Sequence, residues 1–182
     1  MKIWRLAARG AIILAAVSAP MAHAFAADYT RQPFGQTPSG QAVEAITLSN
    51  GQGVSATVIS YGATLQSLIA PDRTGKPADI ALGFADIDAY VRNASYFGAS
   101  VGRFANRIGK GRFTLDGKTY QLALNNNGVA ALHGGTKGFD KAVWEVLDLK
   151  RGKTASVTFG HISADGDEGY PGTLTATATY AL

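Results

Sequence analysis

Residues 41–182 are dominated by short stretches in which apolar and polar residues alternate, separated by turns rich in Gly, Asn and Asp. Because successive side chains of a β-strand point to opposite faces, this period of two is typical of strands with one buried face. The alternation predicts strands at residues 43–48, 54–60, 64–70, 79–83, 112–115, 119–122, 143–149, 155–162 and 173–182. So many short, closely spaced strands predict an all-β fold of the β-sandwich class.

Three further segments complete the expected secondary structure. Asp116-Gly117 lies between two alternating runs, which is typical of the turn of a β-hairpin. Residues 28–40 are rich in Pro, Gly, Thr and Gln and are predicted to form an exposed lead-in with one edge strand. Residues 85–92 break the period of two and are predicted to form a short helix.

Residues 1–27 have the pattern of a cleaved signal peptide. Three basic residues precede the apolar run 11–17, which is too short to cross a bilayer as a helix, and small residues suited to cleavage follow at 22–27. A membrane anchor or a core helix is the alternative. We therefore expect export, to the periplasm in a Gram-negative bacterium and otherwise by secretion, with residues 28–182 forming part of one domain that is free of the membrane.

The composition bears on several classes of function. Without residues 1–27, the chain has 14 Lys and Arg against 13 Asp and Glu, a balance that gives no support for nucleic-acid binding. The chain has no Cys, and the same residues 28–182 contain only His133 and His161 as histidines. We therefore expect neither a disulfide nor a metal site.

Polar, Gly-rich segments lie between the predicted strands at residues 97–111, 125–140 and 165–172, where an all-β scaffold usually carries its binding groups. In the second segment His133 precedes two glycines, so its ring can face a cleft and a ligand can approach the backbone closely. Histidine can give or take a proton near neutral pH. The alternative is a turn histidine that forms local hydrogen bonds, and the local pattern leaves both open.

Residues 102–107 read Gly-Arg-Phe-Ala-Asn-Arg. Guanidinium and amide groups supply directed hydrogen bonds that suit sugar hydroxyls. If the stretch is a strand, Arg103 and Arg107 share one face and Asn106 lies on the other. The alternative, which the segment alone favours, is that the arginines pair with acidic residues on a neighbouring loop.

Residues 165–172, Asp-Gly-Asp-Glu-Gly-Tyr-Pro-Gly, are acidic but do not complete an EF-hand loop. We expect a rigid turn with solvated carboxylates rather than a calcium site. His161 is expected to be a surface or packed strand residue, and Phe113, Phe139 and Trp144 are expected in the core rather than as sugar-stacking platforms.

Four ordered segments resemble the aldose 1-epimerase (galactose mutarotase) family. They are residues 48–75, 96–127, 132–144 and 163–182, which include YFGASVGRFANRIGKG, LHGGTKGFD and DGDEGYPG. The resemblance covers nearly all of residues 28–182. It implies a large β-sandwich with an open sugar cleft. It also implies acid–base interconversion of the α and β anomers of a free aldohexose, galactose or glucose, without a cofactor.

The same resemblance assigns roles to three residues. His133 corresponds to a catalytic-site histidine that binds the sugar near its ring oxygen. Asn106 and Arg107 correspond to residues that hold the sugar hydroxyls, whereas Arg103 is expected to be structural.

The family's second histidine, its sugar-binding aspartate and its glutamate base lie in segments beyond the one that ends at Leu182, and His161 and Glu168 do not correspond to them. The resemblance therefore implies the N-terminal portion of a truncated sandwich, with little or no activity of its own. The alternatives are a sugar-binding module without catalysis, a fragment that does not fold stably, and a relative acting on sugar phosphates.

Overall fold

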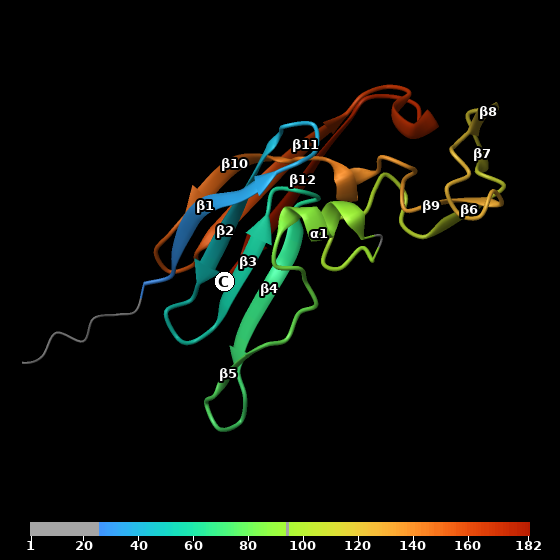
Figure 1. Ribbon diagram of the computed structural model, residues 1–182. Helices are drawn as coiled ribbons and strands as arrows, with labels where there is room; N and C mark the ends of the chain where they lie inside the picture. Colours follow the sequence, from blue (N-terminus) through green and yellow to red (C-terminus); the bar gives the residue numbers. More distant parts are fainter. Residues whose placement is uncertain (1–25, 94) are drawn as a thin grey trace, which may run out of the picture.

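Two antiparallel sheets pack face to face in the computed structural model, which describes residues 26–93 and 95–182 (Figure 1). The larger sheet contains, in chain order, β1 (Asp28–Gln36), β2 (Ala42–Ser49), β3 (Ser55–Ile59), β4 (Thr64–Pro71) and β5 (Pro77–Asp79). The smaller sheet contains β10 (Glu145–Lys150), β11 (Ser156–Ser163) and β12 (Leu174–Ala181). The all-β sandwich expected from the alternation is confirmed. The expected leader lies outside the described residues, apart from Ala26 and Ala27.

The space between the sheets holds the main hydrophobic core. Ile46 and Leu48 of β2 and Val58 of β3 face Val157 and Phe159 of β11, and all five are fully buried. Neighbouring positions on the same strands point the other way, as the pleat requires. Burial of both faces of β2 and β3 fixes their register, because a slip of one residue would exchange the two faces.

The second face of the larger sheet is covered by α1 (Ile87–Arg92), the expected short helix. Val43, Ala45 and Ile59 of the sheet pack against Ile87 and Tyr90 of the helix. The helix begins after Asp86, whose side chain accepts a hydrogen bond from the Ala89 amide at 2.7 Å and so satisfies one free N–H of the first turn.

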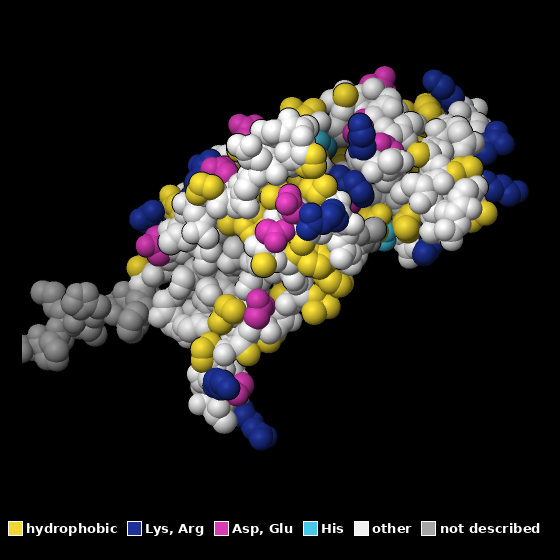
Figure 2. Space-filling view, in the orientation of Figure 1, with side chains coloured by type: hydrophobic (Ala, Val, Ile, Leu, Met, Phe, Trp, Pro, Cys, Tyr) yellow, Lys and Arg dark blue, Asp and Glu magenta, His cyan; other side chains and the backbone are white. Residues whose placement is uncertain are grey.

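A smaller lobe at one end of the sandwich is built from two ribbons (Figure 1). One is the hairpin of β7 (Arg112–Leu115) and β8 (Lys118–Gln121), which the Asp-Gly turn predicts. The other pairs β6 (Arg107–Gly109) with β9 (Ala130–Leu132), and sequence reasoning assigned both segments to loops. Basic side chains are scattered singly over this end of the molecule on the face shown (Figure 2).

The predicted strand at residues 79–83 is wrong in its position. β5 ends at Asp79, and Oδ1 of Asp79 accepts hydrogen bonds from the amides of Leu68 and Ala81, each at 3.0 Å. The carboxylate thus takes N–H groups that a continuing ladder would use. Ile80 and Leu82 are left exposed as a result.

His161 of β11 points into the region between the sheets. Its ring packs edge-on against Phe139, with centroids 4.9 Å apart, and lies tilted by 34° against Trp144 at 5.3 Å. This confirms the packed-strand expectation for His161, and burial of Phe139 and Trp144 confirms their core assignment. Burial lowers the pKa of His161; the charge of Asp167 opposes this shift, and that of Arg103 adds to it.

The lowered pKa of His161 predicts a loss of stability on acidification. At pH values between the unfolded pKa, about 6.5, and the lower folded pKa, the unfolded chain binds a proton that the native chain does not. The free energy of unfolding therefore decreases as the pH is lowered through this range. Urea unfolding between about pH 7.5 and 5.5 should show this decline, and His161→Gln should make it shallower. Equal slopes for the two chains would contradict the assignment.

Candidate functional site

The short ribbon of β6 and β9 brings two distant segments of the chain together. Arg107 lies opposite Leu132, so Asn106 and His133 meet at the next position beyond the ribbon. The backbone N–H of Asn106 donates to Nδ1 of His133 at 3.1 Å. The backbone N–H of His133 donates to the backbone carbonyl of Asn106 at 2.9 Å. Both residues have left-handed backbone conformations, with φ of 66° and 50°. Such conformations in residues other than glycine are uncommon and cluster at functional sites.

The contact at Nδ1 determines what His133 can offer a ligand. Because Nδ1 accepts a hydrogen bond from a backbone amide, the proton of the neutral ring is on Nε2. A second proton, on Nδ1, would face the Asn106 N–H and remove that hydrogen bond. In this geometry the half-buried ring presents an N–H donor rather than a free base.

Arg107 is oriented by two side-chain amides. Its Nε donates to Oδ1 of Asn126 at 2.8 Å, and its Nη1 donates to Oδ1 of Asn106 at 3.1 Å. These two contacts restrain the guanidinium plane while the residue stays exposed. The remaining N–H groups of Arg107 and the Nδ2 amide of Asn106 make no hydrogen bond within the described residues. Asn126 was missed by sequence reasoning, and the run of three asparagines at 125–127 was its one available signal.

The glycines after His133 serve packing rather than ligand access, which corrects the sequence interpretation. A Cβ at Gly134 would overlap the carbonyl oxygen of Gly102, and a Cβ at Gly135 would overlap the Glu168 carboxylate. Both glycines also have positive φ, at 87° and 119°. The pair therefore lets the backbone after His133 lie close to the backbone at Gly102 and to the Glu168 side chain.

Arg103 is a structural residue, as expected. Its guanidinium donates five hydrogen bonds of 2.6 to 2.9 Å, and every acceptor lies on the segment 163–172. The acceptors are four backbone carbonyls and the Ser163 hydroxyl, so the alternative of pairing with a carboxylate is wrong for Arg103. Residues 102–106 do not form a strand, so the expectation that Arg103 and Arg107 share one strand face does not apply.

The acidic segment also differs from the turn with solvated carboxylates that we expected. Glu168 accepts hydrogen bonds from the amides of Thr136 and Lys137, at 2.7 and 2.9 Å, and so holds the loop that follows His133. Asp165 accepts from the Gly172 amide, and Asp167 accepts from the Ser163 hydroxyl. Within the described ranges, no three His, Asp or Glu residues gather as metal ligands.

Asn106, Arg107 and His133 are thus brought together, while His161 lies against Phe139 and Trp144 and forms no hydrogen bond with these three among the described residues. Arg107 also borders an open hollow with apolar walls, formed by Arg103, Phe104, Ile108, Phe113 and Tyr170. Phe113 packs against Tyr170 at the base of this lobe, at a centroid distance of 5.9 Å, which agrees with its expected packing role.

Comparison with known proteins identifies the family. The profile of the aldose 1-epimerase family matches residues 44–182. The chain belongs to the aldose 1-epimerase family. It is 48% identical over 154 residues to galactose mutarotase of Sus scrofa, covering 84% of this chain and 43% of that protein. It is 41% identical over 145 residues to aldose 1-epimerase of Escherichia coli K12, covering 80% and 41%.

Solved structures agree with this assignment. A GalM/aldose epimerase homologue from C. elegans superposes with a TM-score of 0.72 at 39% identity, covering 78% of this chain and 42% of that one. Galactose 1-epimerase from Lactobacillus acidophilus gives 0.73 at 28% identity, covering 85% and 44%. This member of the aldose 1-epimerase family therefore spans less than half the length of the relatives it matches.

Substitutions of Arg103 and Arg107 should differ in their effect on the stability of this family member. Hydrogen bonds to charged groups contribute about 1.5–3 kcal/mol each, so Arg103→Met should lower the free energy of unfolding by more than about 3 kcal/mol. Arg107→Met, at an exposed position, should lower it by less than about 1 kcal/mol. Urea unfolding of the two variants measures this difference, and equal losses would contradict the roles assigned here.

Proposed function

We propose that the chain forms the sugar-holding part of an aldose 1-epimerase site, for a free aldohexose such as galactose or glucose. The observation that carries this proposal is the meeting of Asn106, Arg107 and His133 across β6 and β9 in a member of that family. Each of the three side chains offers N–H donors. The hydroxyl and ring oxygens of a sugar accept such hydrogen bonds, and several donors held in fixed directions can select one orientation of the ring.

Interconversion of anomers requires two proton transfers. A base takes the proton of the C1 hydroxyl while an acid protonates the ring oxygen, O5. The C1–O5 bond breaks and the ring opens. The C1–C2 bond then rotates, and the ring closes on the other face. In the proposed site Nε2–H of His133 donates a hydrogen bond to the ring oxygen and keeps its proton, while a separate acid protonates that oxygen as the ring opens. Arg107 and Asn106 hold the hydroxyls and keep the sugar in one orientation.

The same geometry limits what the three residues do alone. Within the described residues, no hydrogen bond or ion pair links a carboxylate to Asn106, Arg107 or His133. All three act as hydrogen-bond donors toward the sugar, so the base that takes the C1 hydroxyl proton and the acid that protonates the ring oxygen must both be other groups. We therefore propose that the chain binds the sugar and, by itself, accelerates anomer exchange little.

We also propose that the protein is exported, on the basic, apolar and small-residue order of residues 1–27. In the part of the chain that the structure describes, no helix is long and apolar enough to span a membrane.

The proposed function predicts binding without catalysis by the 182-residue chain. In ¹⁵N-labelled protein, D-galactose should shift the signals of Asn106, Arg107 and His133, and His133→Ala should weaken binding by about tenfold, the equivalent of one good hydrogen bond. His161→Gln, whose side chain lies away from the site, should bind as the original chain does.

Polarimetry of α-D-galactose gives the second part of this test. The optical rotation should relax to equilibrium at nearly the same rate with and without the chain. Strong acceleration that disappears in His133→Ala would show that the chain contains its own base and would contradict the account. A folded chain that binds neither galactose nor glucose would overturn the sugar site itself.

A further inference from the structure

The ring of Tyr96 lies against the ring of His133, with centroids 4.5 Å apart and planes inclined by 48°. Tyr96 comes from the loop after α1, which precedes β6 and is far in sequence from β9 and His133. Its backbone is in the left-handed region, with φ of 54°, where residues other than glycine need support from their surroundings. The Tyr96 carbonyl accepts a hydrogen bond from the Ala99 amide at 3.3 Å, which closes this turn.

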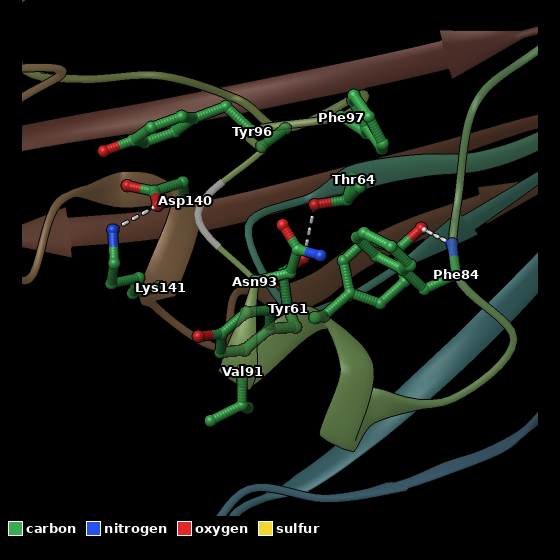
Figure 3. Close-up of a pocket in the computed structure, with 11 residues that line it drawn as sticks. Tyr61, Thr64, Phe84, Val91, Asn93, Tyr96, Phe97, Asp140 and Lys141 are labelled. Carbon is green, nitrogen blue, oxygen red and sulfur yellow. Dashed lines mark hydrogen bonds and ion pairs between the residues drawn. The ribbon is translucent and has the colours of Figure 1, made fainter.

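A partly buried ion pair supports Tyr96 from a third segment. Nζ of Lys141 lies 5.1 Å from the centre of the Tyr96 ring, within the range of a cation–π contact. The Asp140 carboxylate holds this ammonium through Oδ2, and its side chain is only 8% exposed. Figure 3 shows Asp140 and Lys141 joined beside Tyr96, around a small cavity that Tyr61 and Thr64 also line.

Asp140 has one carboxylate oxygen committed to Lys141 and one without a partner. Among the described side chains, Oδ1 of Asp140 is buried and accepts no hydrogen bond. A buried carboxylate depends strongly on the one cation that it contacts. The Lys141 ammonium is therefore held at this point rather than free to move in solvent, although a third of its side chain remains exposed.

We propose that Tyr96 and Lys141 are positioning residues for His133 in the sugar site. The proposal rests on the proposed function for its consequence, since it explains how the Nε2–H donor keeps its direction. The hydrogen bond at Nδ1 fixes one point of the imidazole, and rotation about that point still tilts the ring plane. The Tyr96 ring blocks this tilt on one face, and Lys141 holds Tyr96 in place.

This arrangement adds a specific chemical requirement at two positions. Position 96 needs an aromatic ring, because a flat surface must cover the imidazole and a π face must attract the ammonium. Position 141 needs a cation within reach of both that ring and the Asp140 carboxylate. The phenolic hydroxyl of Tyr96 is not required for either contact.

The spectroscopic test uses the isotope-labelled 182-residue chain, with the ring signals of His133 assigned by their loss in His133→Ala. Lys141→Met and Tyr96→Leu should shift these signals, whereas Lys141→Arg and Tyr96→Phe should keep them near their original positions. Lys137→Met is the matched control. Its lysine lies four positions earlier and forms no ion pair or aromatic contact in the described residues.

Galactose affinity, measured on the same five variants, gives the functional readout. It should fall severalfold in Lys141→Met and Tyr96→Leu and recover in Lys141→Arg. Ring signals and affinity that are the same in Lys141→Met and Lys137→Met would overturn the proposal. If Tyr96→Leu does not fold, the comparison of Met with Arg at position 141 still decides.

The two proposals fail in different ways. If the His133 signals respond as expected but even the original chain binds no sugar, the proposed function is wrong and the positioning contact stands. If the chain binds sugar and Lys141→Met changes neither readout, the positioning proposal alone is wrong.

Discussion

The reciprocal hydrogen bonds between Asn106 and His133 are the constraint on which the candidate site depends. They lie just beyond a ribbon of three residue pairs and fix the relation between two segments separated by the β7–β8 hairpin. One of them also sets the tautomer of the imidazole, because a backbone amide occupies Nδ1. The same contact therefore gives both the position of His133 and its chemical character as a donor.

The surrounding contacts attach this ribbon to the sandwich. Arg103, which precedes β6, donates hydrogen bonds to the loop 163–172. Glu168 in that loop accepts hydrogen bonds from the backbone that follows His133. The Phe139 amide donates to the Gly102 carbonyl at 3.3 Å, and the Trp144 indole donates to the Phe139 carbonyl at 3.0 Å. Because Phe139 and Trp144 are buried between the sheets, the site is joined directly to the main core.

The sandwich could be predicted because its strands are long enough for alternation to be visible and because both faces of β2 and β3 are buried. The β6–β9 ribbon could not, since three residues show no period and the pairing partner is more than twenty residues away. Residue types pointed to Asn106, Arg107 and His133, but the hydrogen bonds that join them depend on that unseen pairing. The roles of Tyr96, Asn126 and Lys141 likewise come from contacts between distant segments, which local patterns do not encode.

The measurement that tests this account most directly is a scalar coupling across the hydrogen bond between the Asn106 amide nitrogen and Nδ1 of His133. It is recorded at neutral pH in the ¹⁵N-labelled chain. We predict a resolved coupling, as expected when Nδ1 of His133 accepts the hydrogen bond and the neutral ring carries its proton on Nε2. A proton on Nδ1, or no coupling in a folded chain, would contradict the geometry from which the site and its chemistry have been derived.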